Sequence, residues 1–467
     1  MHHLLLFEQH VGDHGPLART RPVFELRCGS MGLGERLARR YGAPRVFHHV
    51  REPLAAVHRQ LLTEQERSVT VNDLTAALSA AVLLLDGALL GSASAGLPDA
   101  EGPDELGLIA EVVNHRAGPA GALDPVRREG DRLVYLRLRR DTAAALLGRA
   151  GPDLGRLLQE ARRTPSIAVR RLEEGQVPVM TYPWHLLEHN GAVLAEDYAA
   201  YRERPRPEAA LDPSAVFLRH GRRVAEPTNG PGRGGDVYLG RDSVVGAFVV
   251  FDTGAGPIVV EGGATVESHC HLKGPAWIGR GSTLWAFTDL KEGCSLGPWC
   301  RVCGQLEEVI LQGYMHKFHV GFLGHSYLGE GVNLGDQTVT SNLRNDRAPV
   351  PVHLGLEPQR HVNSGRRYVG SLIGDGATTG TNTNLTTGAV VEPLSSIVSA
   401  AATPKYVSGL LHDGRHLPWP FGPAYAAMRI LLEERLQRRL PAGHEALYRW
   451  VYDELRASRR ALPRKGA

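Results

Sequence analysis

Residues 319–335, HVGFLGHSYLGEGVNLG, set five glycines among five Leu and Val residues. Similar units begin elsewhere, at Val260 (VEGGAT), Ile278 (IGRGST), Leu296 (LGPWCR), Leu328 (LGEGVN) and Ile373 (IGDGAT). The first three units follow one another at intervals of three hexads, and the last two are out of phase. Hexads with an aliphatic residue and small turn residues are typical of short strands stacked coil upon coil. The pattern predicts a parallel β-helix interrupted by loops.

The hexads also predict which residues of this stretch face inward. Within 319–335 these are Leu323, Leu328, Val332 and Leu334. The alternative explanation is chance recurrence in a chain with 54 glycines.

Length and composition point to a globular protein of several domains. The chain has 467 residues, which is more than one core usually supports, so two or three domains are expected. Hydrophobic residues make up 42% and charged residues 22%, as in ordinary globular proteins. The net charge of +3 gives no extended basic field, so we expect no nucleic-acid partner.

The apolar segments predict a soluble protein without a membrane partner. Residues 4–7, LLLF, are too short for a signal peptide and lack a basic leader, so they read as a buried strand. The longest apolar stretch, residues 76–90, contains Ser79 and Asp86 and is shorter than a bilayer span. Five cysteines, an odd number, fit a reducing compartment. A cytoplasmic location is therefore expected.

Changes of texture divide the chain. Residues 1–215 alternate apolar runs with helical-period segments, which predicts an α/β domain with a mostly parallel sheet. A Pro- and Gly-rich stretch, EPTNGPGRGGD at 226–236, marks a boundary inside an expected linker at 216–240. The hexads then predict a β-helix domain over 241–410.

The last part of the chain, residues 411–467, predicts a helical extension. AYAAMRILLEERLQRRL at 424–440 and EALYRWVYDELRASRR at 445–460 both carry apolar residues at helical spacing. Each helix is expected to bury its apolar stripe on the end of the β-helix or on a neighbouring subunit.

The stretch HVGFLGHSYLGEGVNLGDQTVTSN, residues 319–342, resembles the acetyltransferase half of a bacterial bifunctional family. Members of that family are N-acetylglucosamine-1-phosphate uridyltransferases and glucosamine-1-phosphate acetyltransferases. The resemblance implies that His319 is the catalytic base and that Phe322 contacts substrate. It also implies that Asn333 and Asn342 belong to the sugar and acetyl-CoA site, with Thr381 near the cofactor. A left-handed β-helix, acetyl-CoA as co-substrate and a homotrimer are further implications.

A closer likeness covers nearly the whole chain and is carried by three motifs. These are ARTRPVFELRCG at 18–29, YPWHLLEHN at 182–190, and GYMHKFHVGFLGHSYLGE at 313–330 followed by SNLRND. On these motifs the chain is similar to GlmU-like sugar nucleotidyltransferases whose N-terminal domain is degenerate. The likeness implies a transferase that acts on a sugar phosphate and a nucleotide.

Chemistry supports a catalytic role for His319. Acetylating a sugar amine from a thioester requires the ammonium to lose a proton, and imidazole titrates near neutral pH. The oxyanion then needs a fixed donor, which Asn333 or Asn342 can supply. Lys317 and Arg301 are candidates for the sugar phosphate. The alternative for a histidine here is a turn or stacking residue, and His325 is expected to be a hydrogen-bonded structural histidine.

The N-terminal half has less of the expected chemistry. PLARTRP at 16–22 stands where a Gly-rich loop would cradle nucleotide phosphates, which leaves Arg19 and Arg21 to hold them by charge. The alternative is two solvated arginines. VLLLDG at 82–87 resembles the strand end that holds Mg²⁺ and nominates Asp86, although Asp-Gly is also an ordinary turn.

The cysteines allow two interpretations. CRVC at 300–303 and HCH at 269–271 could form a zinc site, but no second C-x-x-C is present. Small residues that point into the β-helix core explain the same positions.

Three functions therefore compete. The first is acetyl-CoA-dependent N-acetylation of an amino-sugar-1-phosphate such as glucosamine-1-phosphate, coupled to uridylyl transfer that gives UDP-N-acetylglucosamine. The second is nucleotidyl transfer alone, with the β-helix as a trimerising scaffold. The third is a non-catalytic protein that binds sugar nucleotides.

Overall fold

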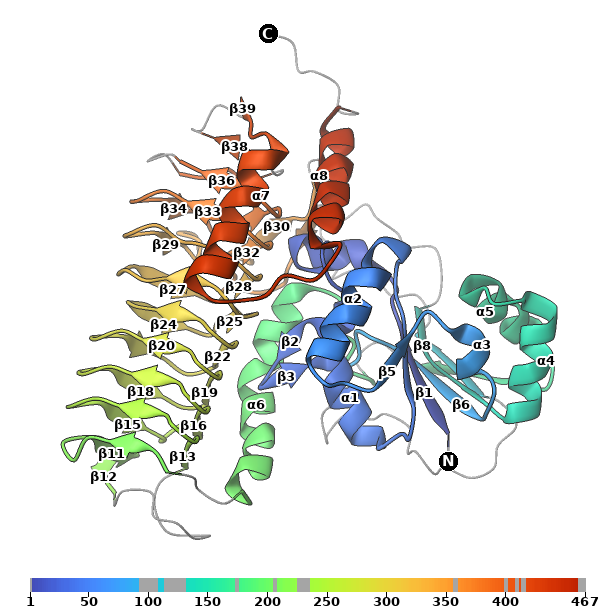
Figure 1. Ribbon diagram of the computed structural model, residues 1–467, viewed down its shortest axis with the longest axis horizontal. Coiled ribbons are helices and arrows are strands. Elements are labelled where there is room, and N and C mark those ends of the chain that lie inside the picture. Colours follow the sequence, from blue (N-terminus) through green and yellow to red (C-terminus); the bar gives the residue numbers. More distant parts are fainter. Residues whose placement is uncertain are drawn as a thin grey trace.

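A seven-stranded sheet organises the N-terminal half of the computed structural model (Figure 1). The structure describes residues 2–91, 108–112, 132–172, 176–204, 208–224, 236–355, 360–398, 402–407, 411–412 and 417–460. Along the sheet the strands are β5 (Val69–Val71), β4 (Val46–His49), β1 (His3–Phe7), β6 (Val82–Asp86), β8 (Arg132–Leu138), β7 (Leu108–Val112) and β9 (Ala168–Leu172). All these pairs are parallel except β6–β8 and β7–β8. The predicted α/β domain with a mostly parallel sheet is confirmed.

Helices and short turns surround this sheet. They are η1 (Val11–Ala18), η2 (Val23–Glu25), α1 (Leu33–Tyr41), α2 (Glu52–Glu64), α3 (Leu74–Ala77), α4 (Arg140–Ala150), α5 (Leu154–Arg163) and α6 (Pro183–Arg202), with a small hairpin of β2 (Arg27–Cys28) and β3 (Met31–Gly32). The run Leu4–Phe7 is buried throughout, which explains why it forms a central strand. Side chains of Asp73 and Asp153 cap α3 and α5 by accepting backbone N–H groups.

The second half is a β-helix whose stacked coils form three sheets, here called its first, second and third faces. The first face contains β10 (Ala210–Leu211), β14 (Val244–Val245), β17 (Thr265–Val266), β20 (Thr283–Leu284), β23 (Arg301–Val302) and β26 (His316–Lys317). The second contains β12 (Arg222–Arg223), β11 (Val216–Arg219), β15 (Val250–Asp252), β18 (His271–Lys273), β21 (Asp289–Leu290), β24 (Gln305–Glu307) and β27 (Phe322–Gly324). The third contains β13 (Val237–Leu239), β16 (Ile258–Val260), β19 (Ala276–Ile278), β22 (Cys294–Leu296), β25 (Ile310–Leu311), β28 (Tyr327–Leu328), β32 (Leu372–Ile373), β35 (Val390–Val391) and β37 (Tyr406–Val407).

Shorter pairs complete the last coils: β29 (Val339–Thr340) with β34 (Asn384–Leu385), β33 (Thr378–Thr379) with β36 (Ser396–Ile397), β30 (Pro351–His353) with β31 (His361–Asn363), and β38 (Leu411–His412) with β39 (Leu417–Pro418). Within the three faces every pairing is parallel except β11–β12. The parallel β-helix predicted from the hexads is therefore present. Leu323, Leu328, Val332 and Leu334 all lie in its core, as predicted.

The β-helix begins before residue 241, where the hexad pattern predicted its start. Strand β10 pairs with β14, and β11 pairs with β15, so residues 210–219 already form part of the first coil. Strand β13 pairs with β16 on the third face. The range expected to be a linker, 216–240, thus contributes strands to the β-helix. A linker was inferred because the stretch at 226–236 is rich in Pro and Gly.

The α/β domain docks on the third face. Helix α6 runs beside this face (Figure 1), and its Leu194, Tyr198 and Tyr201 form one buried cluster with Val259 and Trp277. Asn190 of α6 is fully buried; it accepts from the backbone N–H of Gly29 and donates to the carbonyl of Gly293. One side chain thus joins both halves.

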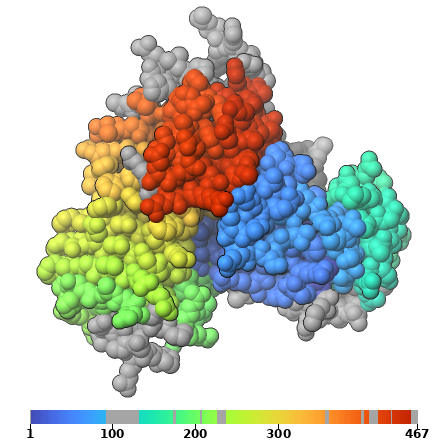
Figure 2. Space-filling model, viewed as in Figure 1, coloured from blue at the N-terminus to red at the C-terminus, as the bar shows by residue number. Residues whose placement is uncertain are grey.

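The C-terminal helices cover the junction between the two halves (Figure 2). Helix α7 (Phe421–Ile430) continues as a π-turn at Leu431–Arg435, and Met428 packs beside Gly331 and Gly376 of the β-helix. Helix α8 (His444–Arg460) instead buries its Leu447, Val451 and Leu455 in the α/β core.

The structure tests the expected packing of α8 and the expected lack of a membrane span. The stripe of α8 was expected on the end of the β-helix or on another subunit. Its Leu447, Val451 and Leu455 instead join the α/β core beside α2, while its Tyr448 and Tyr452 lie in a cluster with Leu394 of the β-helix. Within the described ranges, none of the helices combines the length and the apolar character that a bilayer span requires.

Candidate active site

A shortened corner distinguishes the coils around His319. Between the first and second faces, most corners have four residues, such as 285–288 and 318–321. The corner at Cys303–Gly304 has only two. Consequently the coil that leads from Arg301 to its partner His316 is shorter than the full three-hexad coil that leads from Thr283 to Arg301. The short corner leaves room between the corners above and below it.

Aromatic rings occupy that room and support His319. The rings of Trp285 and Phe318 lie 4.4 Å apart although a whole coil separates their corners. Phe318 stacks on His316 at 5.1 Å and meets the ring of His319 edge-on at 5.2 Å. His319 itself is exposed. The predicted base His319 is therefore exposed, and the residue before it, Phe318, packs against the rings of Trp285 and His316.

Lys317 lies beneath this corner, inside the β-helix. It follows Val302 in the inward row of the first face and is only 1% exposed. Its Nζ donates to the carbonyls of Cys303 (2.8 Å) and His319 (3.0 Å). Burial lowers the pKa of Lys317 to about 8. The prediction that Lys317 binds the sugar phosphate does not fit this structure, because its ammonium points into the core and supports the His319 corner from inside.

The outward row of the first face holds three polar residues in register. Arg301 pairs with His316, and His316 is bridged to Asn333 in the next coil. Asn333 Oδ1 lies 3.1 Å from Nδ1 of His316. The structure thus places the predicted substrate residues Arg301 and Asn333 on one strip, on the same side of the corner as His316.

Phe322 and Asn342 meet on the second face, beyond the corner. Both approach Gly324 so closely that a Cβ added there would lie 2.4 Å from Cζ of Phe322 and 2.8 Å from Nδ2 of Asn342. Glycine at this position therefore leaves room for the side chains of two predicted substrate residues.

His325 fixes the amide of Asn342. Nδ2 of Asn342 lies 3.0 Å from Nδ1 of His325, whose ring stacks on Tyr368 at 5.0 Å. The other ring nitrogen of His325 lies 3.4 Å from Oε2 of Glu308. Burial lowers the pKa of His325 to about 4, which keeps the ring neutral and lets Nδ1 accept the amide hydrogen. His325 thus has a hydrogen-bonded structural role, and its partner, Asn342, was not predicted.

Thr381 is exposed at the same corner in a later coil. Its neighbour Asn382 donates its backbone N–H to the carbonyl of Asp336, and Asp336 occupies the corner that follows His319. A hollow of about 410 Å³ lies next to Asn342 and is lined by Ser341, Leu343, Arg344, Asn345, Asp346, Thr386, Thr387 and Lys405. The predicted acetyl-CoA residues Asn342 and Thr381 therefore lie on successive coils above His319.

The arginines of the N-terminal loop are neutralised at the domain interface. Arg19 pairs with Glu392 at 2.9 Å, and Arg21 pairs with Asp375. Both carboxylates come from the β-helix, and both are buried. The predicted triphosphate-binding role of Arg19 and Arg21 does not fit this structure, because their charge is matched by carboxylates rather than left for a nucleotide.

Asp86 is likewise engaged. Its Oδ2 accepts from Nε of Arg132 at 2.5 Å, and its Oδ1 accepts from the backbone N–H of Ala88 at 3.0 Å. Asp86 and Arg132 are both 1% exposed or less. Mg²⁺ needs several oxygen ligands and keeps bound water. Asp86 is fully buried, and among the described residues it belongs to no group of converging metal-ligating side chains, so its predicted metal role is not supported.

Three of the five cysteines pack in the β-helix core. Cys270, Cys294 and Cys300 are buried among the aliphatic residues of the coils, and burial raises the pKa of each thiol. Within the described residues, no cysteine belongs to a group with metal-ligand spacing. The interpretation as small core residues is confirmed for Cys270, Cys294 and Cys300, whereas Cys303 is half-buried at the two-residue corner.

Comparisons with known proteins point to one class of enzyme. Residues 4–205 match the model of a family described as sugar nucleotidyl transferase. The bifunctional protein GlmU of Paracoccus denitrificans (strain Pd 1222) is 35% identical over 159 residues, which are 32% of this chain and 31% of that protein. The bifunctional sugar-1-phosphate nucleotidylyltransferase/acetyltransferase of Sulfurisphaera tokodaii is 30% identical over 152 residues, 31% of this chain and 36% of that protein.

The chain spans about a third of the length of these curated relatives. Their names denote transferases, the class that the motifs predict. The resemblance of this chain to GlmU-like sugar nucleotidyltransferases is therefore confirmed.

Proposed function

We propose that the protein transfers an acetyl group from acetyl-CoA to the amine of an amino-sugar-1-phosphate, with glucosamine-1-phosphate as the first candidate. The observation that carries this proposal is the corner at His319. An exposed imidazole stands there between Asn333 on the first face and an Asn342 amide held by His325 on the second.

Each group then has a chemical task. His319 takes a proton from the sugar ammonium, and the free amine attacks the thioester carbonyl. An N–C bond forms, and the oxyanion of the tetrahedral intermediate is stabilised by a fixed donor, for which Asn342 is the best placed. The attacking nitrogen gives up a second proton as the C–S bond breaks, and the CoA thiolate leaves and takes up that proton. Arg301 and Phe322 bind the sugar phosphate and the sugar ring.

The cofactor and the assembly follow from the same resemblance. We take the β-helix to be left-handed and the protein to be a homotrimer, with acetyl-CoA between neighbouring β-helices near Asn342 and Thr381. Val320 and Phe287, which are 56% and 73% exposed near this corner, support a covered surface. Lys405 in the adjacent hollow suits the phosphates of CoA, whereas Arg344 there is paired with Asp346.

We propose that the α/β half, residues 1–209, no longer catalyses nucleotidyl transfer. Its loop arginines pair with Glu392 and Asp375, and its predicted metal ligand, Asp86, pairs with Arg132. The half instead positions and stabilises the β-helix, from residue 210 to about 407, together with the C-terminal helices. Nucleotidyl transfer that yields UDP-N-acetylglucosamine, with Mg²⁺, remains the second candidate because residues 4–205 match the sugar nucleotidyl transferase family.

One substrate screen separates these functions. Free CoA is measured with acetyl-CoA and a panel of amino-sugar-1-phosphates, and pyrophosphate is measured with UTP or dTTP and sugar-1-phosphates. We expect CoA release, which His319→Ala lowers by more than tenfold. His220→Ala is the matched control, since His220 is exposed at the turn between β11 and β12, in the first coil of the β-helix.

Each alternative gives a different result in the same screen. Pyrophosphate release that Asp86→Ala abolishes would favour the nucleotidyltransferase. Ligand binding without either product would favour the non-catalytic protein. A loss of less than tenfold in His319→Ala removes His319 as the base.

A further inference from the structure

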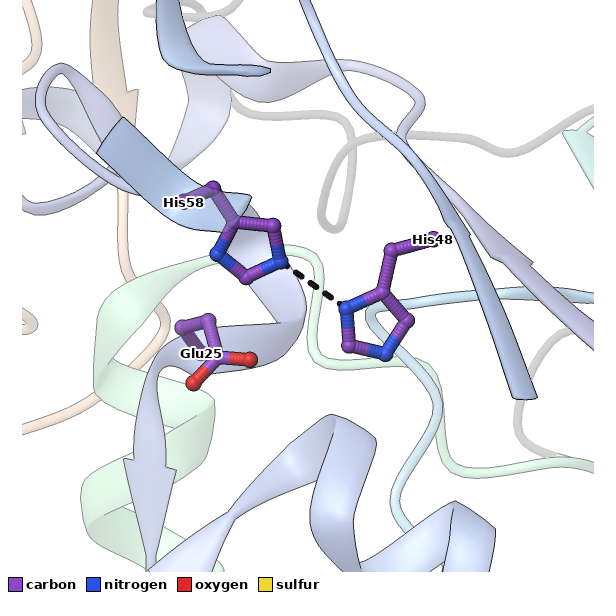
Figure 3. A group of neighbouring side chains, drawn as sticks. All are labelled: Glu25, His48 and His58. Carbon is purple, nitrogen blue, oxygen red and sulfur yellow. Dashed lines mark hydrogen bonds between the residues drawn. The ribbon is translucent and has the colours of Figure 1, made fainter. Parts of the chain in front are cut away.

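Two histidines and a glutamate converge inside the α/β domain (Figure 3). His48 lies on β4, His58 on α2 and Glu25 at the end of η2. One ligand atom of each lies within 4.8 Å of the other two. Nδ1 of His48 and Nε2 of His58 are 2.9 Å apart, and Phe24 packs on both rings. None of these residues touches the corner at His319, so the proposed acetyl transfer does not use them.

The spacing of the ligand atoms fits a metal ion. Two imidazole nitrogens bound to one tetrahedral zinc ion at about 2.0–2.1 Å lie roughly 3.3 Å apart. The observed 2.9 Å therefore needs only a small outward movement. Imidazole and carboxylate are also the ligands that zinc and its neighbours in the transition series prefer.

The two facing nitrogens of the pair share one hydrogen at most, and a metal ion between them would replace that hydrogen. With a metal on Nδ1 of His48 and Nε2 of His58, each ring carries its hydrogen on the opposite nitrogen and stays neutral.

The charges around the cluster allow a cation. Glu25 supplies a negative charge, and Nη1 of Arg67 contacts both of its oxygens at 3.0 and 3.1 Å. A carboxylate offers about four lone-pair sites, so the two contacts with Arg67 leave lone pairs of Glu25 for a metal. Arg67 and Arg59 oppose the cation by charge, and they lower the expected affinity without removing a ligand.

One side of the cluster is open. Glu25 and His58 both line a cavity of about 240 Å³ between the α/β domain and the β-helix. A site with three protein ligands and an open side keeps a water or a small ligand in its fourth position. The cavity is large enough for such a ligand, and it connects the cluster to the domain interface.

We propose that Glu25, His48 and His58 bind a divalent transition-metal ion of the zinc class, with its open position toward the interdomain cavity. The site is independent of the proposed acetyl transfer. Its role is to hold η2 against α2. The loop just before η2 carries Arg19 and Arg21, which pair with carboxylates of the β-helix.

The test uses the full chain, freed of metal with a chelator and titrated with Co²⁺ as a spectroscopic probe. We expect one Co²⁺ per chain with visible d–d absorption, displacement by Zn²⁺, and a higher Tm with Zn²⁺. His58→Gln and Glu25→Gln should each weaken Co²⁺ binding by at least tenfold. His49→Gln is the matched control, since the next residue of a strand points to the opposite face, and it should bind Co²⁺ like the wild type.

Several outcomes would overturn the proposal. They are the absence of stoichiometric binding, equal binding by the wild type and Glu25→Gln, or equal loss in His49→Gln. A strong thiolate-to-cobalt band would assign the metal to cysteine. If His58→Gln fails to fold by circular dichroism, the Zn²⁺-dependent shift in Tm of the wild type, lost in Glu25→Gln, decides the matter. Acetyl transfer by the metal-free protein is measured separately, so failure of one proposal leaves the other distinguishable.

Discussion

The side-chain amide of Asn342 lies 3.0 Å from Nδ1 of His325, which holds it beside Phe322 on the second face of the β-helix. Both residues sit near the corner of His319, and in the proposed reaction it is Asn342 that meets the thioester. His325 is therefore a positioning residue, and its ring works by staying neutral and accepting a hydrogen bond.

This relationship predicts strong coupling between the two residues. Loss of one oxyanion donor lowers kcat by about 10²–10³, and we expect that loss in Asn342→Ala. His325→Ala should lower kcat by roughly tenfold or more, because the amide is no longer fixed. In the double variant the two effects should not add, since both act through one amide. Steady-state kinetics of CoA release measures this, and additive losses would contradict the relationship.

Lys317 predicts an unusual pH dependence of stability. Burial lowers its pKa from 10.5 to about 8 in the folded state, so between these pH values the unfolded chain binds more protons. The stability of the wild type therefore rises with pH from about 8 to 10.5, by at most about 3 kcal/mol for this group. Other groups titrate in the same range.

The comparison with Lys317→Met isolates the contribution of the buried amine. We expect the Tm difference between wild type and variant to change in favour of the wild type as the pH rises from 7 to 10. Thermal unfolding followed by circular dichroism measures both proteins in the same buffers. A constant difference across this range would show that Lys317 keeps an ordinary pKa in the fold.

Lys317 also shows where sequence patterns stop being informative. The hexad spacing correctly placed inward residues such as Leu323 and Leu328. The two-residue corner at Cys303–Gly304 shifts the register, so Lys317 aligns with Val302 although it is charged. The shortened interval between Arg301 and His316 is visible in the sequence, but only strand pairing shows what it means.

The partners of the N-terminal charges were beyond prediction for another reason. Arg19 meets Glu392 and Arg21 meets Asp375 across 373 and 354 positions of the chain, and no local pattern specifies such pairs. The histidines at 48 and 58 were also missed, because their approach to Glu25 depends on how η2 and α2 pack. The family motifs indicated which chemistry to look for, while tertiary packing decided which residues remain able to perform it.

The pair of Asp86 and Arg132 predicts a stability effect without a catalytic one. Asp86→Asn leaves a buried guanidinium without its counter-charge, which costs about 3–5 kcal/mol. We expect a clearly lower Tm in Asp86→Asn and unchanged CoA release per folded molecule. The double variant Asp86→Asn with Arg132→Met should recover part of the Tm. No recovery, together with loss of pyrophosphate release, would instead indicate a metal-binding Asp86.

The substitution Gly324→Ala should change the positions of two site residues without much change in the stability of the fold. A Cβ at this position would lie 2.4 Å from the ring tip of Phe322 and 2.8 Å from the Asn342 amide, both of which are ends of movable side chains. In Gly324→Ala these two side chains should give way while the coil stays intact, so the Tm changes little. Because misplaced binding groups weaken the transition state strongly, kcat/KM for the amino sugar should fall by about tenfold or more.

Gly148→Ala is the control for Gly324→Ala, since a Cβ on Gly148 in α4 meets nothing within 4 Å. Its kcat/KM should equal that of the wild type. Equal kinetics in Gly324→Ala and the control would mean that Phe322 and Asn342 do not meet substrate. A large fall in the Tm of Gly324→Ala would mean that the coil, rather than the two side chains, absorbs the added methyl group.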